Sequence, residues 1–136
     1  MRYLLDTNVW IKILKGKNLL LIDRFAEIDH SELAVCSIVR AELMHGAEKY
    51  SNVPRRRLDV TELLARVTSL PFDDPCANTN GVIRHSLENR ACIIGPYDSR
   101  IAAIALVHDL TLVSGNVNEF KRVHGLRVED WSLPLD

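Results

Sequence analysis

The sequence is poor in the features that mark secreted, disulfide-bonded or membrane-spanning proteins. Its cysteines, Cys36, Cys76 and Cys92, are odd in number and form no CxxC pair or other paired metal spacing, which favours reduced thiols in a cytosolic protein. Only a few apolar residues precede Asp6, far fewer than a signal peptide needs, and no apolar run approaches the length of a membrane span. We therefore expect a cytoplasmic protein without membrane association.

The chain also lacks a strong charge of either sign. Its 17 Lys and Arg residues against 18 Asp and Glu residues give a formal net charge of −1, unlike a strongly basic nucleic-acid-binding protein. A net charge near zero is nevertheless compatible with an acidic site that is ringed by basic residues. With 136 residues, of which 47% are hydrophobic, the chain is expected to form one domain over residues 1–136 that folds without disulfides or a structural metal.

Short apolar runs alternate with longer stretches of helical periodicity along the chain. Because strands separated by helices of this length imply right-handed crossovers, the pattern predicts an α/β sandwich with a mainly parallel sheet. The expected strands are residues 3–5, 33–35, 67–70, 111–114 and 126–128. The expected helices run from a cap at Thr7 or Asn8 to Gly16, over 19–27, from a cap at Ser37 towards Tyr50, over 55–66, over about 74–91, and onward from 95–98.

Three acidic residues occupy positions that acids usually avoid or use for a purpose. Asp6 directly follows an apolar strand, at the end where open α/β sheets place ligands, although a turn or cap role explains it equally well. Glu42 shares with Val39 and Leu43 the helical stripe that should face the core, where an acid needs compensation. An ion pair with Arg40 or another arginine, or a place at the edge of the stripe, is the alternative to a functional role. Asp98 stands at a helix start, where capping alone accounts for it.

Taken together, these acids predict a metal site. Each lies at the end of a strand or near the beginning of a helix, so this topology can bring all three to one edge of the sheet. Such a cluster needs a cation, and hard oxygen ligands suit Mg²⁺ or Mn²⁺. The implied chemistry is metal-assisted hydrolysis of a phosphodiester.

The segment after the fourth expected strand offers further candidates for this site. Asn116 can supply a neutral amide oxygen and Glu119 a charged ligand, with a polar turn around Gly115 as the alternative. Thr7 and Ser114 are auxiliary candidates beside them. Phe120 and Trp131 are expected to be packing residues.

An ordered set of short motifs spans nearly the whole chain. It consists of Leu5-Asp6-Thr7-Asn8, Ala41-Glu42-Leu43 with Gly46, Gly95-Pro96-Tyr97-Asp98 with Ile101-Ala102-Ala103, Leu112-Val113-Ser114 with Asn116, Glu119-Phe120, Val123, Gly125-Leu126 and Glu129-Asp130-Trp131. In this order and at these intervals, the set resembles the PIN-domain toxins of the VapC type. The resemblance implies a PIN-like three-layer α/β/α sandwich with a mainly parallel sheet of about five strands, as a single PIN domain over residues 1–136.

The resemblance also implies an activity and partners. The chain would be a metal-dependent endoribonuclease, the toxin of a type II toxin–antitoxin pair, that cleaves RNA, with tRNA favoured, and inhibits translation until a VapB-like antitoxin neutralises it. Asp6 and Asp98 would hold Mg²⁺, which Mn²⁺ can replace, and Glu42 would complete the site as a ligand or as the activator of the attacking water. The protein would be a homodimer that contacts DNA only through its antitoxin.

One residue departs from the pattern of the family. Many PIN domains carry an aspartate where this sequence has Asn116. The number of metal ions therefore stays open, with Glu119 as the alternative ligand. We expect Asn116 to act as a neutral or outer ligand.

Cations around an acidic centre are expected to bind RNA phosphates. Arg55-Arg56-Arg57 is the densest basic run, but three consecutive helical residues cannot share one face, so the run is expected mainly to solvate the surface, with an RNA- or partner-facing role as the alternative. The candidate RNA contacts are Lys15, Lys17, Arg40, Arg84, Arg90, Arg100, Lys121 and Arg122.

Other functions fit the sequence less well. The histidines show no HxxxH spacing, and no Ser or Cys partner can be assigned, which disfavours zinc and triad mechanisms. A haloacid-dehalogenase-type phosphatase requires a second Asp two positions after the first, where this chain has Asn8, and a receiver-like domain requires paired acids that are missing. The alternative outside these enzyme classes is a catalytically weak PIN-like module that binds RNA or protein, which the clustered carboxylates argue against.

Overall fold

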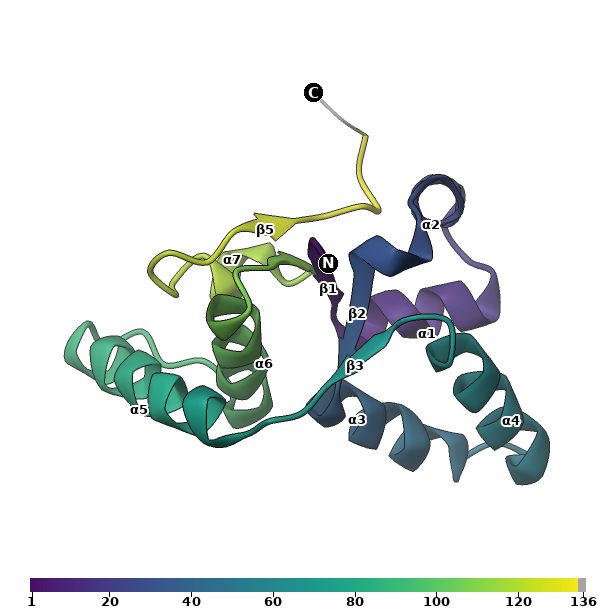
Figure 1. Ribbon diagram of the computed structural model, residues 1–136, viewed down its shortest axis with the longest axis horizontal. Coiled ribbons are helices and arrows are strands. Elements are labelled where there is room, and N and C mark those ends of the chain that lie inside the picture. The colour runs from purple at the N-terminus through teal and green to yellow at the C-terminus, as the bar shows by residue number, and fades with distance from the viewer. Residues whose placement is uncertain (135–136) are drawn as a thin grey trace.

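Five short strands form one parallel sheet in the order β3-β2-β1-β4-β5, with β1 at its centre (Figure 1). A computed structural model describes residues 1–134 of the chain. In the central register, Leu4 of β1 lies opposite Ala34 of β2 and Leu112 of β4. The strands are β1 (Tyr3–Leu5), β2 (Leu33–Cys36), β3 (Thr68–Leu70), β4 (Thr111–Val113) and β5 (Val128–Glu129).

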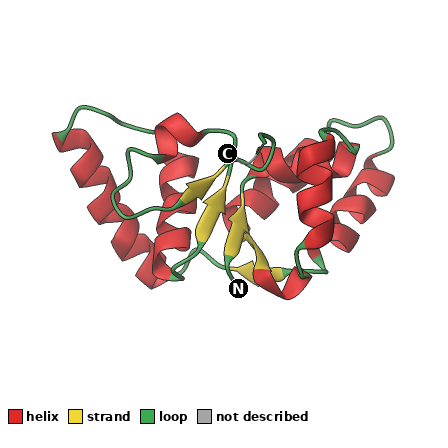
Figure 2. Ribbon diagram, turned by 90° about the horizontal axis from the view of Figure 1, so that it is seen from above, coloured by secondary structure: helices red, strands yellow, loops and turns green. Residues whose placement is uncertain are grey.

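Helices cover the sheet on both sides, which gives the expected three-layer α/β/α sandwich. Figure 2 shows the strands between two groups of helices, with α1 to α4 in one group and α5 to α7 in the other, as the labels of Figure 1 identify them. The helices are α1 (Thr7–Lys15), α2 (Leu19–Glu27), the 3₁₀ helix η1 (His30–Glu32), α3 (Ser37–Ala47), α4 (Val53–Leu64), α5 (Asp74–Asn89), α6 (Pro96–Val107) and α7 (Val117–Phe120).

Apolar side chains of the central strands and the facing helices form the core. Both Leu4 and Leu5 are fully buried, and the indole nitrogen of buried Trp10 donates a hydrogen bond to the Leu5 carbonyl at 3.1 Å. Phe120 and Trp131 are also buried, which confirms their expected packing role. Burying these side chains supplies the main free energy that holds the layers together.

Helix α2 has the predicted bounds, whereas three other helices begin elsewhere. Helix α1 is capped by Asp6, not by Thr7 or Asn8, because the Asp6 carboxylate accepts a hydrogen bond from the Thr7 amide at 2.8 Å. Helix α3 already includes Ser37 and has Cys36 as its N-cap residue. Helix α4 starts at Val53, two residues before the expected start. Pro54 is tolerated there because an amide in the first turn would have no carbonyl partner within the helix.

The remaining differences concern short elements. Residues 117–120 form α7 where a polar turn was the alternative, and η1 was not predicted, because single turns are too short for periodicity to show. Strand β5 is Val128–Glu129 instead of 126–128, and strands β3 and β4 are each one residue shorter than expected. Strand β2 extends one residue further than expected, and α5 ends at Asn89 instead of about residue 91. No helix among residues 1–134 has both the length and the apolar character needed to cross a bilayer.

Candidate active site

The candidate site lies where β1 and β4 are neighbours at the middle of the sheet. From β1 the chain order runs outward to β2 and β3 on one side, and to β4 and β5 on the other. Open α/β sheets bind ligands at such a switch point, beyond the carboxyl ends of the strands. Asp6 follows β1 and Ser114 follows β4, so both side chains belong to this edge.

Asp6 is both a helix cap and a member of the site. Its side chain is 7% exposed, and its two carboxylate oxygens accept hydrogen bonds from the Thr7 amide and from the Ser114 hydroxyl, each at 2.8 Å. Ser114 Oγ in turn accepts a hydrogen bond from the backbone amide of Asn116 at 3.0 Å. Burial raises the pKa of Asp6, while the hydrogen bonds from Ser114 and Thr7 oppose the rise.

Glu42 reaches the site from α3, at the edge of the apolar stripe. No ion pair to Glu42 is present among residues 1–134, and Arg40 donates to Ser69 Oγ at 3.2 Å, so the ion-pair explanation of Glu42 is wrong. Burial raises the pKa of Glu42, and the charge of Asp6 raises it further. Thr7 Oγ1 is buried without a well-formed hydrogen bond in this part of the chain, yet it lies near enough to Glu42 to oppose the shift.

Asp98 is the third residue of α6 and does not cap that helix. The N-cap residue is Gly95, and no side chain makes a cap hydrogen bond there. Burial raises the pKa of Asp98 to about 6, with further contributions from the charges of Asp6, Glu119 and Glu42. The carboxylates of three separate elements therefore sense one another electrostatically, as the sequence predicted for a cluster.

Asn116 bridges two of these acids. Its side-chain amide nitrogen donates hydrogen bonds to Glu119 at 3.0 Å and to Asp98 at 3.4 Å. An aspartate at this position would add a charge to a cluster whose members already repel one another. The asparagine instead supplies a donor that holds Asp98 and Glu119 in place without that cost.

The three predicted metal ligands line one groove of about 570 Å³. Asn116 and Thr7 also line it. Ser114 and Glu119 are linked to the lining by hydrogen bonds, Ser114 to Asp6 and Glu119 to Asn116. The full lining is Asp6, Thr7, Asn8, Val9, Ile11, Lys12, Leu21, Glu42, Asp98, Gly115, Asn116, Asp130, Trp131 and Ser132. Within residues 1–134, no three His, Cys, Asp or Glu side chains converge closely enough to enclose a metal ion by themselves.

Sequence reasoning missed Asp130 and Lys12 as site residues. Asp130 directly follows β5, so the strand-end rule that selected Asp6 applies to it as well. Lys12 gave no comparable signal, because its position on the groove side of α1 depends on how the helix packs.

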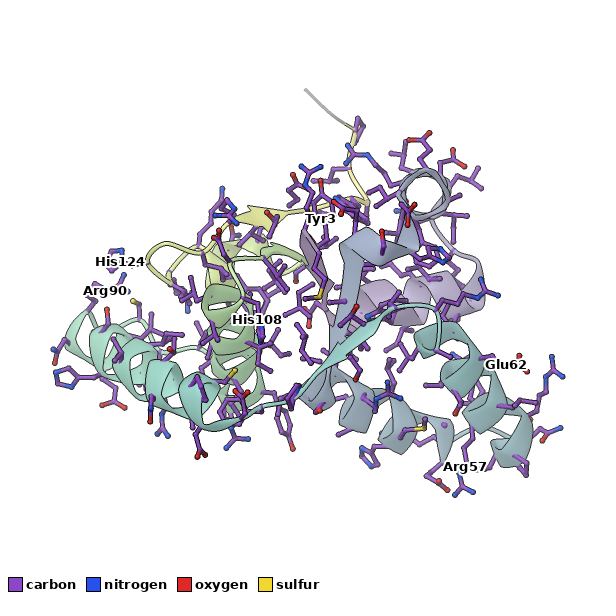
Figure 3. All side chains as sticks on the ribbon, in the orientation of Figure 1. Tyr3, Arg57, Glu62, Arg90, His108 and His124 are labelled. Carbon is purple, nitrogen blue, oxygen red and sulfur yellow. The ribbon has the colours of Figure 1, made fainter. Side chains whose placement is uncertain are left out.

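None of the eight basic residues predicted to contact RNA lines the groove. Several have structural partners instead: Arg90 donates to the Arg122 carbonyl at 2.6 Å, and Arg122 donates to the Ile93 carbonyl at 3.1 Å. Figure 3 places Arg90 at the end of α5 and Arg57 on α4, on opposite sides of the molecule. Arg90 therefore lies on a different side of the molecule from Arg57, which belongs to the arginine run 55–57.

Each arginine of the run 55–57 contacts another side chain in the described part of the chain. Arg55 pairs with Asp59 at 3.2 Å, Arg57 pairs with Glu48, and the Arg56 guanidinium lies 4.2 Å from the centre of the Tyr50 ring. Arg55 pairs within its own helix, whereas Arg56 and Arg57 both contact residues that follow α3. The expectation that the run mainly solvates the surface stays a prediction.

The raised pKa of Asp98 predicts how stability depends on pH without metal. A folded-state pKa of about 6 against an ordinary value of 3.8 means that the folded state binds this proton more tightly. Stability from Asp98 is therefore complete below pH 3.8 and is lost as the pH rises through 6. Chelator-treated protein should melt at a higher temperature at pH 5 than at pH 7.5, as measured by circular dichroism.

Asp98→Asn is the control for this prediction, because asparagine cannot titrate. The variant should show a smaller change of melting temperature between pH 5 and pH 7.5 than the parent. The comparison cancels every group that behaves alike in the two proteins, and Asp29 and Asp73, whose pKa values are lowered by hydrogen bonds, act below this window. Equal changes in both proteins would contradict a raised pKa at Asp98.

Comparisons with known proteins place this geometry in a family. A family model described as the PIN domain matches residues 3–126. The chain is 38% identical over 133 residues to the tRNA(fMet)-specific endonuclease VapC of Shigella flexneri, covering 97% of this chain and 99% of that protein. It is 40% identical over 132 residues to the ribonuclease VapC2 of Haemophilus influenzae, covering 96% and 98%.

Solved structures give the same result. A chain in a DNA-bound VapBC crystal structure from Salmonella typhimurium superposes with a TM-score of 0.90 at 35% identity, covering 96% of this chain and 98% of that one. A chain of VapBC2 from Rickettsia felis, bound to a DNA fragment from its promoter, superposes with a TM-score of 0.88 at 30% identity, covering 96% and 99%. The similarity extends over nearly the full length in each case.

Proposed function

Because this chain belongs to the PIN-domain family of VapC ribonucleases, we propose that it is the toxin of a type II toxin–antitoxin pair and hydrolyses RNA, with tRNA as the substrate. The choice of tRNA as the substrate is supported by two relatives that are named tRNA(fMet)-specific endonucleases. The observation that carries the proposal is the groove that Asp6, Glu42 and Asp98 line together at the carboxyl edge of the sheet. RNA cleavage would inhibit translation.

The donor set of the groove fits Mg²⁺, with Mn²⁺ as a substitute. Asp6, Glu42 and Asp98 offer only hard oxygen ligands, and Thr7 Oγ1 is a buried oxygen without a well-formed hydrogen bond in the described chain. Mg²⁺ keeps several of its waters in protein sites, so it does not need these side chains to enclose it by themselves. When bound, such an ion supplies an activated water and stabilises the charge that develops on the phosphate.

The residues of the chain have separable tasks in this reaction. Asp6 is held rigidly by Thr7 and Ser114, so it anchors the site. Glu42 has a raised pKa, which makes its carboxylate a stronger base for taking a proton from the attacking water. The Asn116 amide positions Asp98 through a hydrogen bond, and it holds Glu119 as an outer member of the site.

The partners follow from the relatives and from the open groove. Three of the solved neighbours are VapBC complexes, two of these bound to DNA, which supports a VapB-like antitoxin that covers the groove and brings the DNA-binding function. We propose a homodimer as the state of this chain. A single-stranded RNA loop suits the groove, because its unstacked bases leave the backbone accessible.

The test maps the RNA ends that the protein produces. Protein freed of antitoxin is incubated with total cellular RNA in Mg²⁺ or Mn²⁺, with chelator and Asp6→Asn as controls, and every new end is sequenced. We expect discrete ends in tRNA that require both the metal and Asp6. If the folded protein produces no Asp6-dependent end, the nuclease proposal is wrong and the alternative, a binding module, is favoured.

A further inference from the structure

The groove contains one positively charged side chain among its lining residues, that of Lys12 on α1. Lys12 lies one helical turn after Asn8, which also lines the groove, so these two residues share the groove side of the helix. Among residues 1–134, the other charged residues of the lining are the four acids Asp6, Glu42, Asp98 and Asp130. Lys12 is therefore the exception in an acidic groove.

The ammonium group of Lys12 has no partner among the described residues. None of the ion pairs within 4.0 Å in residues 1–134 involves Lys12, and its side chain makes no hydrogen bond there. Asp130, the acid of the C-terminal segment in the groove, instead accepts hydrogen bonds at Oδ1 from the amide and the hydroxyl of Ser132. A half-buried cation that lines a groove with four acids but pairs with none of them is available to a ligand.

We propose that Lys12, with Asn8 beside it, binds a backbone phosphate of the RNA that neighbours the phosphate being cleaved. This site rests on the proposed function, because it assigns a second contact to the same substrate. Lys12 is six residues beyond Asp6, which is about 9 Å along the axis of α1, so it addresses a different part of the strand. A compact charge on a flexible stem suits a phosphate whose position varies with sequence.

The physical need for such a contact comes from the charge of the groove. RNA phosphates that approach four carboxylates are repelled unless cations offset this charge, and a cation at the carboxylates neutralises only the part of the strand nearest to it. Lys12 supplies a fixed positive charge along the α1 wall. Its role is binding of the strand, which distinguishes it from a residue that acts on the reacting atoms.

Equilibrium binding tests the site without cleavage. The probe is a fluorescent single-stranded oligoribonucleotide of mixed sequence, and all proteins carry Asp6→Asn so that it stays intact in Mg²⁺. Lys12→Met is compared with Lys12→Arg, which keeps the charge, and with Lys49→Met, which removes an exposed lysine just after α3 that is outside the groove lining. Affinity is measured by anisotropy over a range of salt concentrations.

Lys12→Met should weaken binding by about tenfold at low salt, because a hydrogen-bonded charge contact is lost. The slope of log K against log salt should become shallower by about 0.7, the value for one phosphate contact on a single strand. Lys12→Arg should restore both values and Lys49→Met should leave them unchanged. In proteins that retain Asp6, Lys12→Met should raise KM and leave kcat within about threefold of the parent.

Binding by Lys12→Met within twofold of the parent would overturn the proposal. So would an equal loss in Lys49→Met, which would indicate only the total charge of the protein. A fall in kcat without a rise in KM would overturn it too, because Lys12 would then act in the chemical step. A parent that binds no oligoribonucleotide would overturn it as well. Because the binding assay needs no cleavage, failure of the endonuclease proposal alone would appear only in the mapping of RNA ends.

Discussion

Replacing Asp98 by asparagine should lower RNA cleavage on the order of 10³-fold while the protein stays folded. The substitution keeps the size of the side chain and removes a carboxylate, the proposed metal ligand, from the groove lining. It also removes a carboxylate whose pKa is raised to about 6 by burial and by its acidic neighbours. Activity should fall because the metal is held less well, and the metal-free fold should not weaken because a repulsion is relieved. Single-turnover cleavage of tRNA and thermal melting measure the two effects.

Asp74→Asn is the matched control for this variant. Asp74 also stands in the first turn of a helix, at the exposed start of α5, and it is not among the residues that line the groove. It should retain the activity of the parent. Cleavage by Asp98→Asn within tenfold of the parent would remove Asp98 from the metal site, and equal losses in both variants would indicate a general effect of charge.

The sequence was sufficient to predict the sheet edge on which the acids meet. Asp6 could be placed because the apolar run before it is short and ends abruptly, which marks the end of a buried strand. Asp98 could be placed near a helix start because Gly95 and Pro96 interrupt the chain just before it. The parallel topology then follows from alternating strands and helices, and it brings strand ends to one side. The resemblance to the VapC type added the roles of these residues.

Properties that depend on packing between distant segments could not be predicted in this way. The indole of Trp131 packs against the ring of Tyr3, which lies at the other end of the chain, and this contact brings the C-terminal segment into the groove lining. The pairing of Asn116 with both Asp98 and Glu119 depends on a short helix that periodicity cannot detect. The RNA contacts were predicted from positive charge alone, and charge does not tell which side chains already form hydrogen bonds within the fold.

Trp131→Ala should give the largest loss of stability among the substitutions considered, about 3–5 kcal/mol in the free energy of unfolding. Trp131 is 1% exposed, its ring centre lies 5.0 Å from that of Tyr3 in an edge arrangement, and its indole nitrogen donates to Glu129 at 2.9 Å. Strand β5 has only two residues, so few backbone hydrogen bonds hold the segment after it. The buried indole must therefore supply most of the free energy that fixes this wall of the groove.

Urea unfolding followed by circular dichroism measures this loss, with Trp10 left intact in every variant. Trp131→Phe keeps an aromatic ring against Tyr3 and loses the indole hydrogen bond, so it should lose less stability than Trp131→Ala. Leu133→Ala, at a side chain that is 58% exposed two residues further on, should change the free energy of unfolding by less than about 0.5 kcal/mol. A loss below about 1 kcal/mol for Trp131→Ala would show that the C-terminal segment is held by other contacts, and that the groove wall formed by Asp130 and Ser132 does not depend on this indole.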